Sequence, residues 1–179
     1  TTGQVKALES ADIAVLSSAQ VGALTTTQVG VLTATQVKSL SSGALAGLTT
    51  GTVQALTSTQ LSALPAASVS ALSTAQVAAL TTSQVAEMTA TLVSALTTTQ
   101  VGGMTTAQVM ALTTASVVAL TATQVGSMGT SQVAALTTSQ VAALEVADLK
   151  ALNSTQVNAL SATQIGALTS AQLIGLMGK

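Results

Sequence analysis

Two acidic pairs with the same spacing are the residues of this sequence whose types could do chemistry. Glu9 is followed three residues later by Asp12, and Glu145 is followed by Asp148. Paired carboxylates can bind calcium or transfer a proton. Calcium prefers about six to eight oxygen ligands, and neither pair has further carboxylates close by in the sequence. We therefore interpret both pairs as helix-capping residues, because negative charge is favourable near a helix N-terminus.

The remaining reagents for catalysis are nearly absent. Ser39 follows Lys38, but a serine–lysine nucleophile needs a pocket and an oxyanion hole, and this octapeptide resembles its neighbours. The chain has no His, no Cys, no Arg and no aromatic residue. It therefore lacks an imidazole base, a thiolate and the usual zinc ligands. We expect no enzyme activity, no catalytic residue, no metal site and no cofactor.

The charge and hydropathy of the chain exclude two further classes of protein. The formal net charge is −1 and 5% of the residues are charged, so there is no basic surface for phosphates and no aromatic platform for bases. Thr, Ser and Gln interrupt every apolar run, and a membrane-spanning helix needs about 18 apolar residues. We expect neither nucleic-acid binding nor a membrane span.

The sequence is an uninterrupted array of eight-residue units. Counted from Thr1, 22 units follow one another without insertion or deletion, and three residues remain. The fifth residue of every unit is Val, Ile or Leu, and the eighth is Leu or Met. Such strict repetition indicates an array in which each unit packs on its neighbours. We treat residues 1–179 as one array, and expect it to be a fragment or a processed chain.

The first and fourth residues of the units form a helix-capping motif. Seventeen of the 22 units begin with Thr or Ser, and the fourth residue is Gln in 15. This is the capping box, in which the hydroxyl accepts from the backbone N–H of the fourth residue and the Gln side chain reaches back to the first N–H. Representative pairs are Thr25 with Gln28, Thr81 with Gln84, and Thr137 with Gln140.

Positions five and eight supply the predicted core. Residues three apart lie on one face of a helix, and position seven is mostly Ala, which lets a neighbouring segment approach closely. Representative core residues are Val29, Leu32, Val85, Met88, Val141 and Leu144.

The pattern predicts an all-α solenoid, a superhelix of 22 short helices. Each helix is expected to span positions two to eight, about two turns, after one non-helical capping residue. A single long helix is disfavoured, because a period of eight rotates the apolar stripe by about 80° per unit. The alternative is a thin β-solenoid, since Thr, Val and Gln ladders suit parallel strands. In a strand, however, positions five and eight would point to opposite faces.

Threonine is the other repeated feature. Position two is Thr or Ser in 16 of the 22 units, and we expect stacking to align these hydroxyls in rows on one side of the solenoid. Such rows predict either a solvated surface or, as the alternative function, a surface that binds ice or a polysaccharide.

The unit V-x-A-L-T-T-x-Q, as in Val77 to Gln84, resembles the octapeptide arrays of very large secreted bacterial surface proteins. Many of these are labelled haem-utilisation or adhesion proteins. The resemblance covers essentially the whole chain and implies an extracellular or cell-surface location and a role as a stalk, a spacer or a filament body. Its partners would be adjacent repeats or other copies, stacked end to end, with cell-surface or polysaccharide contact as a further expectation. The haem label is not carried over, because the chain lacks the usual ligands.

Overall fold

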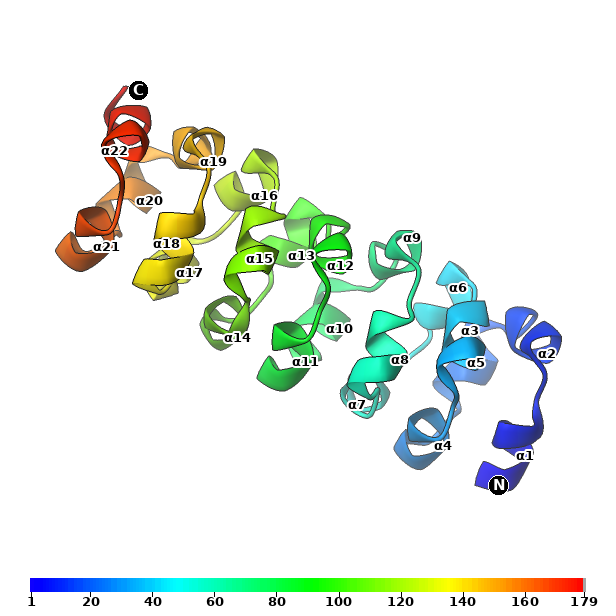
Figure 1. Ribbon diagram of the computed structural model, residues 1–179. Helices are drawn as coiled ribbons and strands as arrows, with labels where there is room; N and C mark the ends of the chain where they lie inside the picture. Colours follow the sequence, from blue (N-terminus) through cyan, green and yellow to red (C-terminus); the bar gives the residue numbers. More distant parts are fainter. Residues whose placement is uncertain (179) are drawn as a thin grey trace.

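The structure is a computed structural model that describes residues 1–178, and this part of the chain folds into 22 short helices (Figure 1). The helices are α1 (Thr2–Ala7), α2 (Ser10–Ala14), α3 (Ser18–Gly22), α4 (Thr26–Gly30), α5 (Ala34–Ser39), α6 (Ser42–Leu45), α7 (Thr50–Gln54), α8 (Ser58–Ser62), α9 (Ala66–Val69), α10 (Thr74–Ala79), α11 (Thr82–Ala86), α12 (Ala90–Ser94), α13 (Thr98–Gly102), α14 (Thr106–Ala111), α15 (Thr114–Val118), α16 (Ala122–Gly126), α17 (Thr130–Ala135), α18 (Thr138–Ala143), α19 (Val146–Ala151), α20 (Ser154–Asn158), α21 (Ala162–Gly166) and α22 (Ser170–Met177).

Each helix begins at position two of its octad, because position one is extended. Thr25, for example, has φ −76° and ψ 161°, and its hydroxyl accepts from the backbone N–H of Gln28. An extended residue cannot continue a helix, so position one fixes the residue after which each helix begins.

The helices end earlier than the sequence pattern predicts. The prediction that each helix spans positions two to eight of its octad is wrong. Most helices contain five or six residues and end at position six or seven. The N–H of position eight bonds to the carbonyl of position five, as from Leu32 to Val29 at 3.1 Å. This shorter i to i−3 bond tightens the last turn. Position eight can then be extended, as at Leu40 with ψ 130°, and turns the chain into the next unit.

The helices wind into a rod with the two termini at opposite ends (Figure 1). Every extensive helix contact joins a helix to the third one after it, as α11 to α14 and α16 to α19. Side-chain hydrogen bonds, described below, also reach back to the fourth unit before. A superhelical turn therefore takes between three and four octads. The prediction of an all-α solenoid is confirmed, and the β-solenoid alternative is not supported, because residues 1–178 contain no strand.

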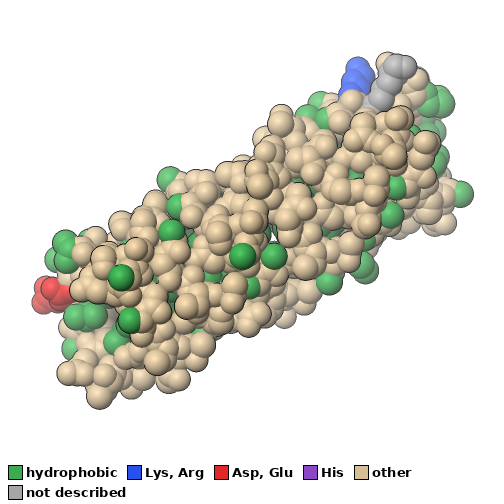
Figure 2. Space-filling model, turned by 180° about the vertical axis from the view of Figure 1, so that it is seen from behind, with side chains coloured by type: hydrophobic (Ala, Val, Ile, Leu, Met, Phe, Trp, Pro, Cys, Tyr) green, Lys and Arg blue, Asp and Glu red, His purple; other side chains and the backbone are tan. Residues whose placement is uncertain are grey.

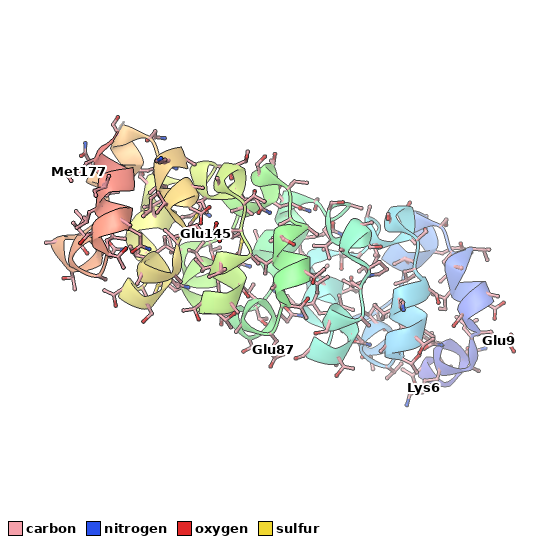
Figure 3. The ribbon with its side chains drawn as sticks, turned by 45° about the horizontal axis from the view of Figure 1, so that its top comes forward. Lys6, Glu9, Glu87, Glu145 and Met177 are labelled. Atoms are coloured by element: carbon pink, nitrogen blue, oxygen red, sulfur yellow. The ribbon has the colours of Figure 1, made fainter. Side chains whose placement is uncertain are left out.

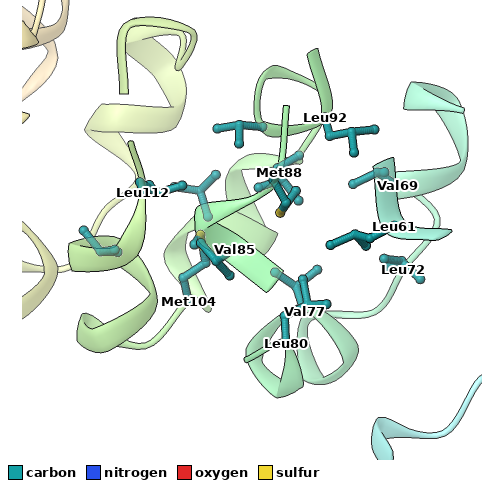
Figure 4. Packing of buried hydrophobic residues seen from close by; sticks show 14 of the residues in the cluster. Leu61, Val69, Leu72, Val77, Leu80, Val85, Met88, Leu92, Met104 and Leu112 are labelled. Carbon is teal, nitrogen blue, oxygen red and sulfur yellow. The ribbon is translucent and has the colours of Figure 1, made fainter. Parts of the chain in front are cut away.

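The core is a continuous column along the superhelix axis. The predicted core residues are buried, with Val29, Val85 and Val141 at 0% exposure and Leu32, Met88 and Leu144 at 3–5%. In Figure 4, side chains from successive turns, such as Leu61, Val77 and Met104, point into one shared interior. The longest helix within residues 1–178 has eight residues, and none is long and apolar enough to cross a membrane.

Candidate functional site

The glutamine at position four makes the most repeated polar contacts of the molecule. In the octad that begins at Thr81, the N–H of Thr81 donates to Gln84 Oε1 at 2.8 Å, and the N–H of Gln84 donates to Thr81 Oγ1 at 3.1 Å. The pairs Thr25 with Gln28 and Thr137 with Gln140 have the same two bonds at 2.8 and 3.2 Å. Together these bonds satisfy two backbone donors at the start of each of these three helices.

The other end of the glutamine amide reaches the preceding turn. Gln84 Nε2 donates to the carbonyl of Val53 at 2.9 Å and to that of Leu56 at 2.7 Å. We call this contact to the position-eight carbonyl, 28 residues earlier, the glutamine link. Within residues 1–178, twelve links occur at 2.6–2.8 Å, from Gln36, Gln60, Gln76, Gln84, Gln100, Gln108, Gln124, Gln132, Gln140, Gln156, Gln164 and Gln172.

These links are buried, so their loss has an energetic cost. Gln84 is 5% exposed, and its amide is the one hydrogen-bond donor that the described residues offer to the carbonyl of Leu56. A buried carbonyl without a donor costs about 1–3 kcal/mol. Gln28 differs from these glutamines because the described chain holds no residue 28 positions before it that could accept a link. It is half-buried and makes only the capping contacts.

The role of the amide nitrogen was missed by sequence reasoning, although the composition of position four carries a signal for it. A capping box accepts Glu as readily as Gln, yet no unit of this chain has Glu at that position. Glutamine supplies an acceptor and two donors, whereas an ionised glutamate supplies acceptors alone. The frequent use of Gln and the absence of Glu at position four therefore indicate a second partner that must receive a hydrogen bond.

Small residues at positions six and seven let successive turns approach closely. A Cβ atom added to Gly47 would lie 2.0 Å from the carbonyl oxygen of Ser18, and one added to Gly22 would lie 2.8 Å from that of Gly47. Position six of one unit therefore faces position seven of the third unit after it, and position seven rests on position two of the third unit before. The alanines at position seven are explained by this contact.

The acidic pairs cap helices, each on its own turn of the rod. The N–H of Glu9 donates to Asp12 Oδ2 at 2.9 Å, and the N–H of Glu145 donates to Asp148 Oδ2 at 2.8 Å. Asp12 is exposed, whereas Asp148 is 3% exposed. Glu9 and Glu145 lie far apart along the rod (Figure 3), and residues 1–178 hold no group of three or more potential metal ligands among His, Cys, Asp and Glu.

Burial controls the titration of Asp148. Loss of solvent raises the pKa of this carboxyl above its ordinary value of 3.8, the hydrogen bond from the Glu145 backbone opposes the rise, and the charge of Glu145 adds to it. Asp148 occupies a position where other units have the link-forming Gln. It offers no amide donor to the preceding turn, so it interrupts the series of links.

The Lys38–Ser39 pair shows no catalytic geometry. Ser39 Oγ donates to the carbonyl of Thr35 at 3.0 Å, within its own helix, and Lys38 is exposed. No pocket is detected among the residues that the structure describes.

The position-two threonines do not gather in rows on one side of the rod, contrary to the expectation from the sequence. Consecutive octads follow one another around the axis, with three to four per turn, so position two is distributed around the circumference. The outer surface in Figure 2 is accordingly dominated by polar and backbone atoms with small scattered apolar groups, and charged groups are seen only near the two ends of this face.

The sequence matches the model of a repeat family. The family model described as the ALTTAQ repeat matches residues 5–42, 53–90, 106–138, 115–146 and 141–177. These segments cover most of the chain and follow the octad array. No curated protein matches the sequence.

Proposed function

Because the chain belongs to the ALTTAQ repeat family, we propose that it is a structural protein whose solenoid serves as an extracellular stalk, spacer or filament body of a bacterial surface or adhesin protein. The observation that carries this proposal is the series of glutamine links. They join turn to turn along the rod, with the shared apolar column between them. Such an architecture sets distance and stiffness, and its length grows with the number of units.

The surface context is supported by the resemblance to octapeptide arrays of secreted bacterial proteins. The absence of cysteine agrees with a long secreted array whose stability comes from stacking and needs no disulfide. Antibodies against the array should label intact, unpermeabilised source cells under the electron microscope. Labelling confined to permeabilised cells would contradict the extracellular placement.

The spacer role predicts that length follows the number of octads. Deleting residues 81–104 removes three octads and keeps the phase of the array, so small-angle scattering should show a shorter rod with unchanged helix content per residue. Deleting residues 81–92 removes one and a half octads and is the matched control. This control should lose helical structure. The half octad that remains breaks the eight-residue phase, so the apolar residues of positions five and eight near the deletion no longer point into the core. An unchanged maximum dimension after the first deletion would refute the spacer role.

The exposed threonines favour polysaccharide or ice binding as a second candidate function. Threonines at position two, such as Thr82, Thr106 and Thr138, are exposed. Co-sedimentation with an insoluble polysaccharide and a thermal-hysteresis measurement test this candidate, and it fails if both are negative.

A further inference from the structure

One joint between turns has an acid in place of the linking amide. Asp148 is the one ionisable side chain at position four after the first four octads. The octads on either side of it keep the interior register, because Gln140 and Gln156 each reach the carbonyl 28 residues earlier, at 2.7 and 2.6 Å. The corresponding acceptor for Asp148 is the carbonyl of Leu120. Within residues 1–178, no backbone N–H or side-chain donor reaches this carbonyl.

The side chain of Asp148 is long enough to reach the preceding turn. At the same position of another octad, the shorter Ser116 brings its Oγ to 3.5 Å from the carbonyl of Met88. The longer glutamines bring Nε2 to 2.6–2.8 Å, and an aspartate oxygen lies one bond beyond a serine Oγ and one bond short of a glutamine Nε2. Asp148 Oδ2 accepts the N–H of Glu145 at 2.8 Å, as the glutamine Oε1 does in other octads. This leaves Oδ1 for the preceding turn.

The protonation state of Asp148 decides whether it can bind the carbonyl of Leu120. An ionised carboxylate and a carbonyl both accept hydrogen bonds, whereas a protonated carboxyl has one O–H to donate. We infer that protonated Asp148 donates through Oδ1 to the carbonyl of Leu120, and so completes in acid the link that the ionised form leaves open. The joint between residues 113–120 and residues 145–152 is then controlled by a proton, while the glutamine links are permanent. This inference goes beyond the proposed function, because it concerns how one joint of the rod responds to its surroundings.

The groups around Asp148 favour the protonated form. The side chain is 3% exposed, and its burial raises the pKa of the carboxyl, the hydrogen bond from the Glu145 backbone opposes this rise, and the charge of Glu145 adds to it. Glu145 and Lys150, the ionisable neighbours on the same octad, are both exposed. The helices α16 and α22, which pack against α19, carry no ionisable side chain, and neither do α15, α18 and α20. Among the described residues, no ammonium group is therefore placed inside the joint to neutralise the carboxylate.

Nuclear magnetic resonance of the isotope-labelled chain tests the inference, because a backbone carbonyl carbon moves to higher frequency when its oxygen accepts a hydrogen bond. The carbonyl carbon of Leu120 should move to higher frequency on acidification, with the same midpoint as the side-chain carboxyl carbon of Asp148. The carbonyl carbon of Leu112 is the internal control, since it keeps the donor of Gln140, and it should not follow this titration. A Leu120 carbonyl that stays unchanged while Asp148 titrates would overturn the inference.

Two variants separate a hydrogen bond from a mere loss of charge. Asp148→Asn is neutral and supplies an amide donor, whereas Asp148→Ala is neutral and supplies none. The array accommodates alanine at position four, as the buried Ala44 shows. At neutral pH, the Leu120 carbonyl carbon of Asp148→Asn should have the frequency that the native chain has in acid, and that of Asp148→Ala should not. Equal frequencies in the two variants would show that Leu120 responds to charge alone and would overturn the inference.

Discussion

Gln84 Nε2 lies 2.7 Å from the carbonyl oxygen of Leu56, 28 residues earlier in the chain. The same side chain accepts the backbone N–H of Thr81 through Oε1. One amide thus starts its own helix and binds it to the turn beneath. The two functions use different atoms, so a substitution can separate them.

Gln84→Glu keeps the capping acceptor and removes the donor of the link. We expect it to lower the free energy of unfolding by about 1–3 kcal/mol, because the Leu56 carbonyl loses its donor and a carboxylate oxygen faces it. Gln28→Glu is the matched control, since Gln28 caps but makes no link, and its effect should stay within about 0.5 kcal/mol. Urea denaturation followed by circular dichroism measures both. Equal effects of the two substitutions would show that the link adds nothing.

Ser116→Gln should add a missing link. Ser116 is 1% exposed at position four, and its Oγ lies 3.5 Å from the carbonyl of Met88, a long contact. A glutamine amide reaches further and should stabilise the chain by about 0.5–1.5 kcal/mol. Ala115→Gln, on the exposed face of the same helix, is the control and should change the unfolding midpoint little. A destabilised Ser116→Gln chain would mean that the space beside Met88 cannot admit the larger side chain.

Much of this architecture follows from the octad. Thr25 and Gln28 determine where a helix begins, and Val29 and Leu32 determine which face of it is buried. The start of the helix and its buried face can be predicted because each depends on the spacing of residues within one octad. The number of octads per superhelical turn cannot be predicted from the octad sequence, because it depends on how successive turns pack on one another. Close approaches such as Gly47 against Ser18 set that packing, and they join residues 29 positions apart.

The helix ends were misjudged for a related reason. Helix propensity favours continuing through the Ala and Leu of positions seven and eight. The buried Leu32, however, must enter the core while the chain turns toward the next capping residue, and tertiary packing outweighs propensity there. The glutamine link was missed because its acceptor lies 28 residues away.

Gly47→Ala tests the close approach between turns. A methyl group at this position meets the Ser18 carbonyl oxygen at 2.0 Å, so the backbones must separate, and we expect a loss of about 1–3 kcal/mol. Gly43→Ala lies in the adjacent helix with nothing within 4 Å of its added Cβ, and should be neutral or stabilising by up to about 1 kcal/mol. The midpoint temperatures of thermal unfolding of the two variants should therefore shift in opposite directions or by clearly unequal amounts. Equal losses of stability in the two variants would mean that the contact between Gly47 and Ser18 is not tight.

The buried Asp148 gives the chain a defined pH dependence. Its pKa is raised by burial, so the folded state binds this proton more tightly than the unfolded state, and stability falls as the pH rises through the raised pKa. Asp148→Gln removes the carboxyl and supplies an amide to the turn beneath. The free energy of unfolding of the native chain, minus that of Asp148→Gln, should be lowest near neutral pH and rise as the pH falls toward 3.8. The carboxylates that do not interact with Asp148 cancel in this difference, which urea denaturation across the pH range measures; the charge of Glu145, which adds to the rise, stays part of the effect. A difference that stays constant, or falls on acidification, would contradict a buried carboxylate that disfavours folding.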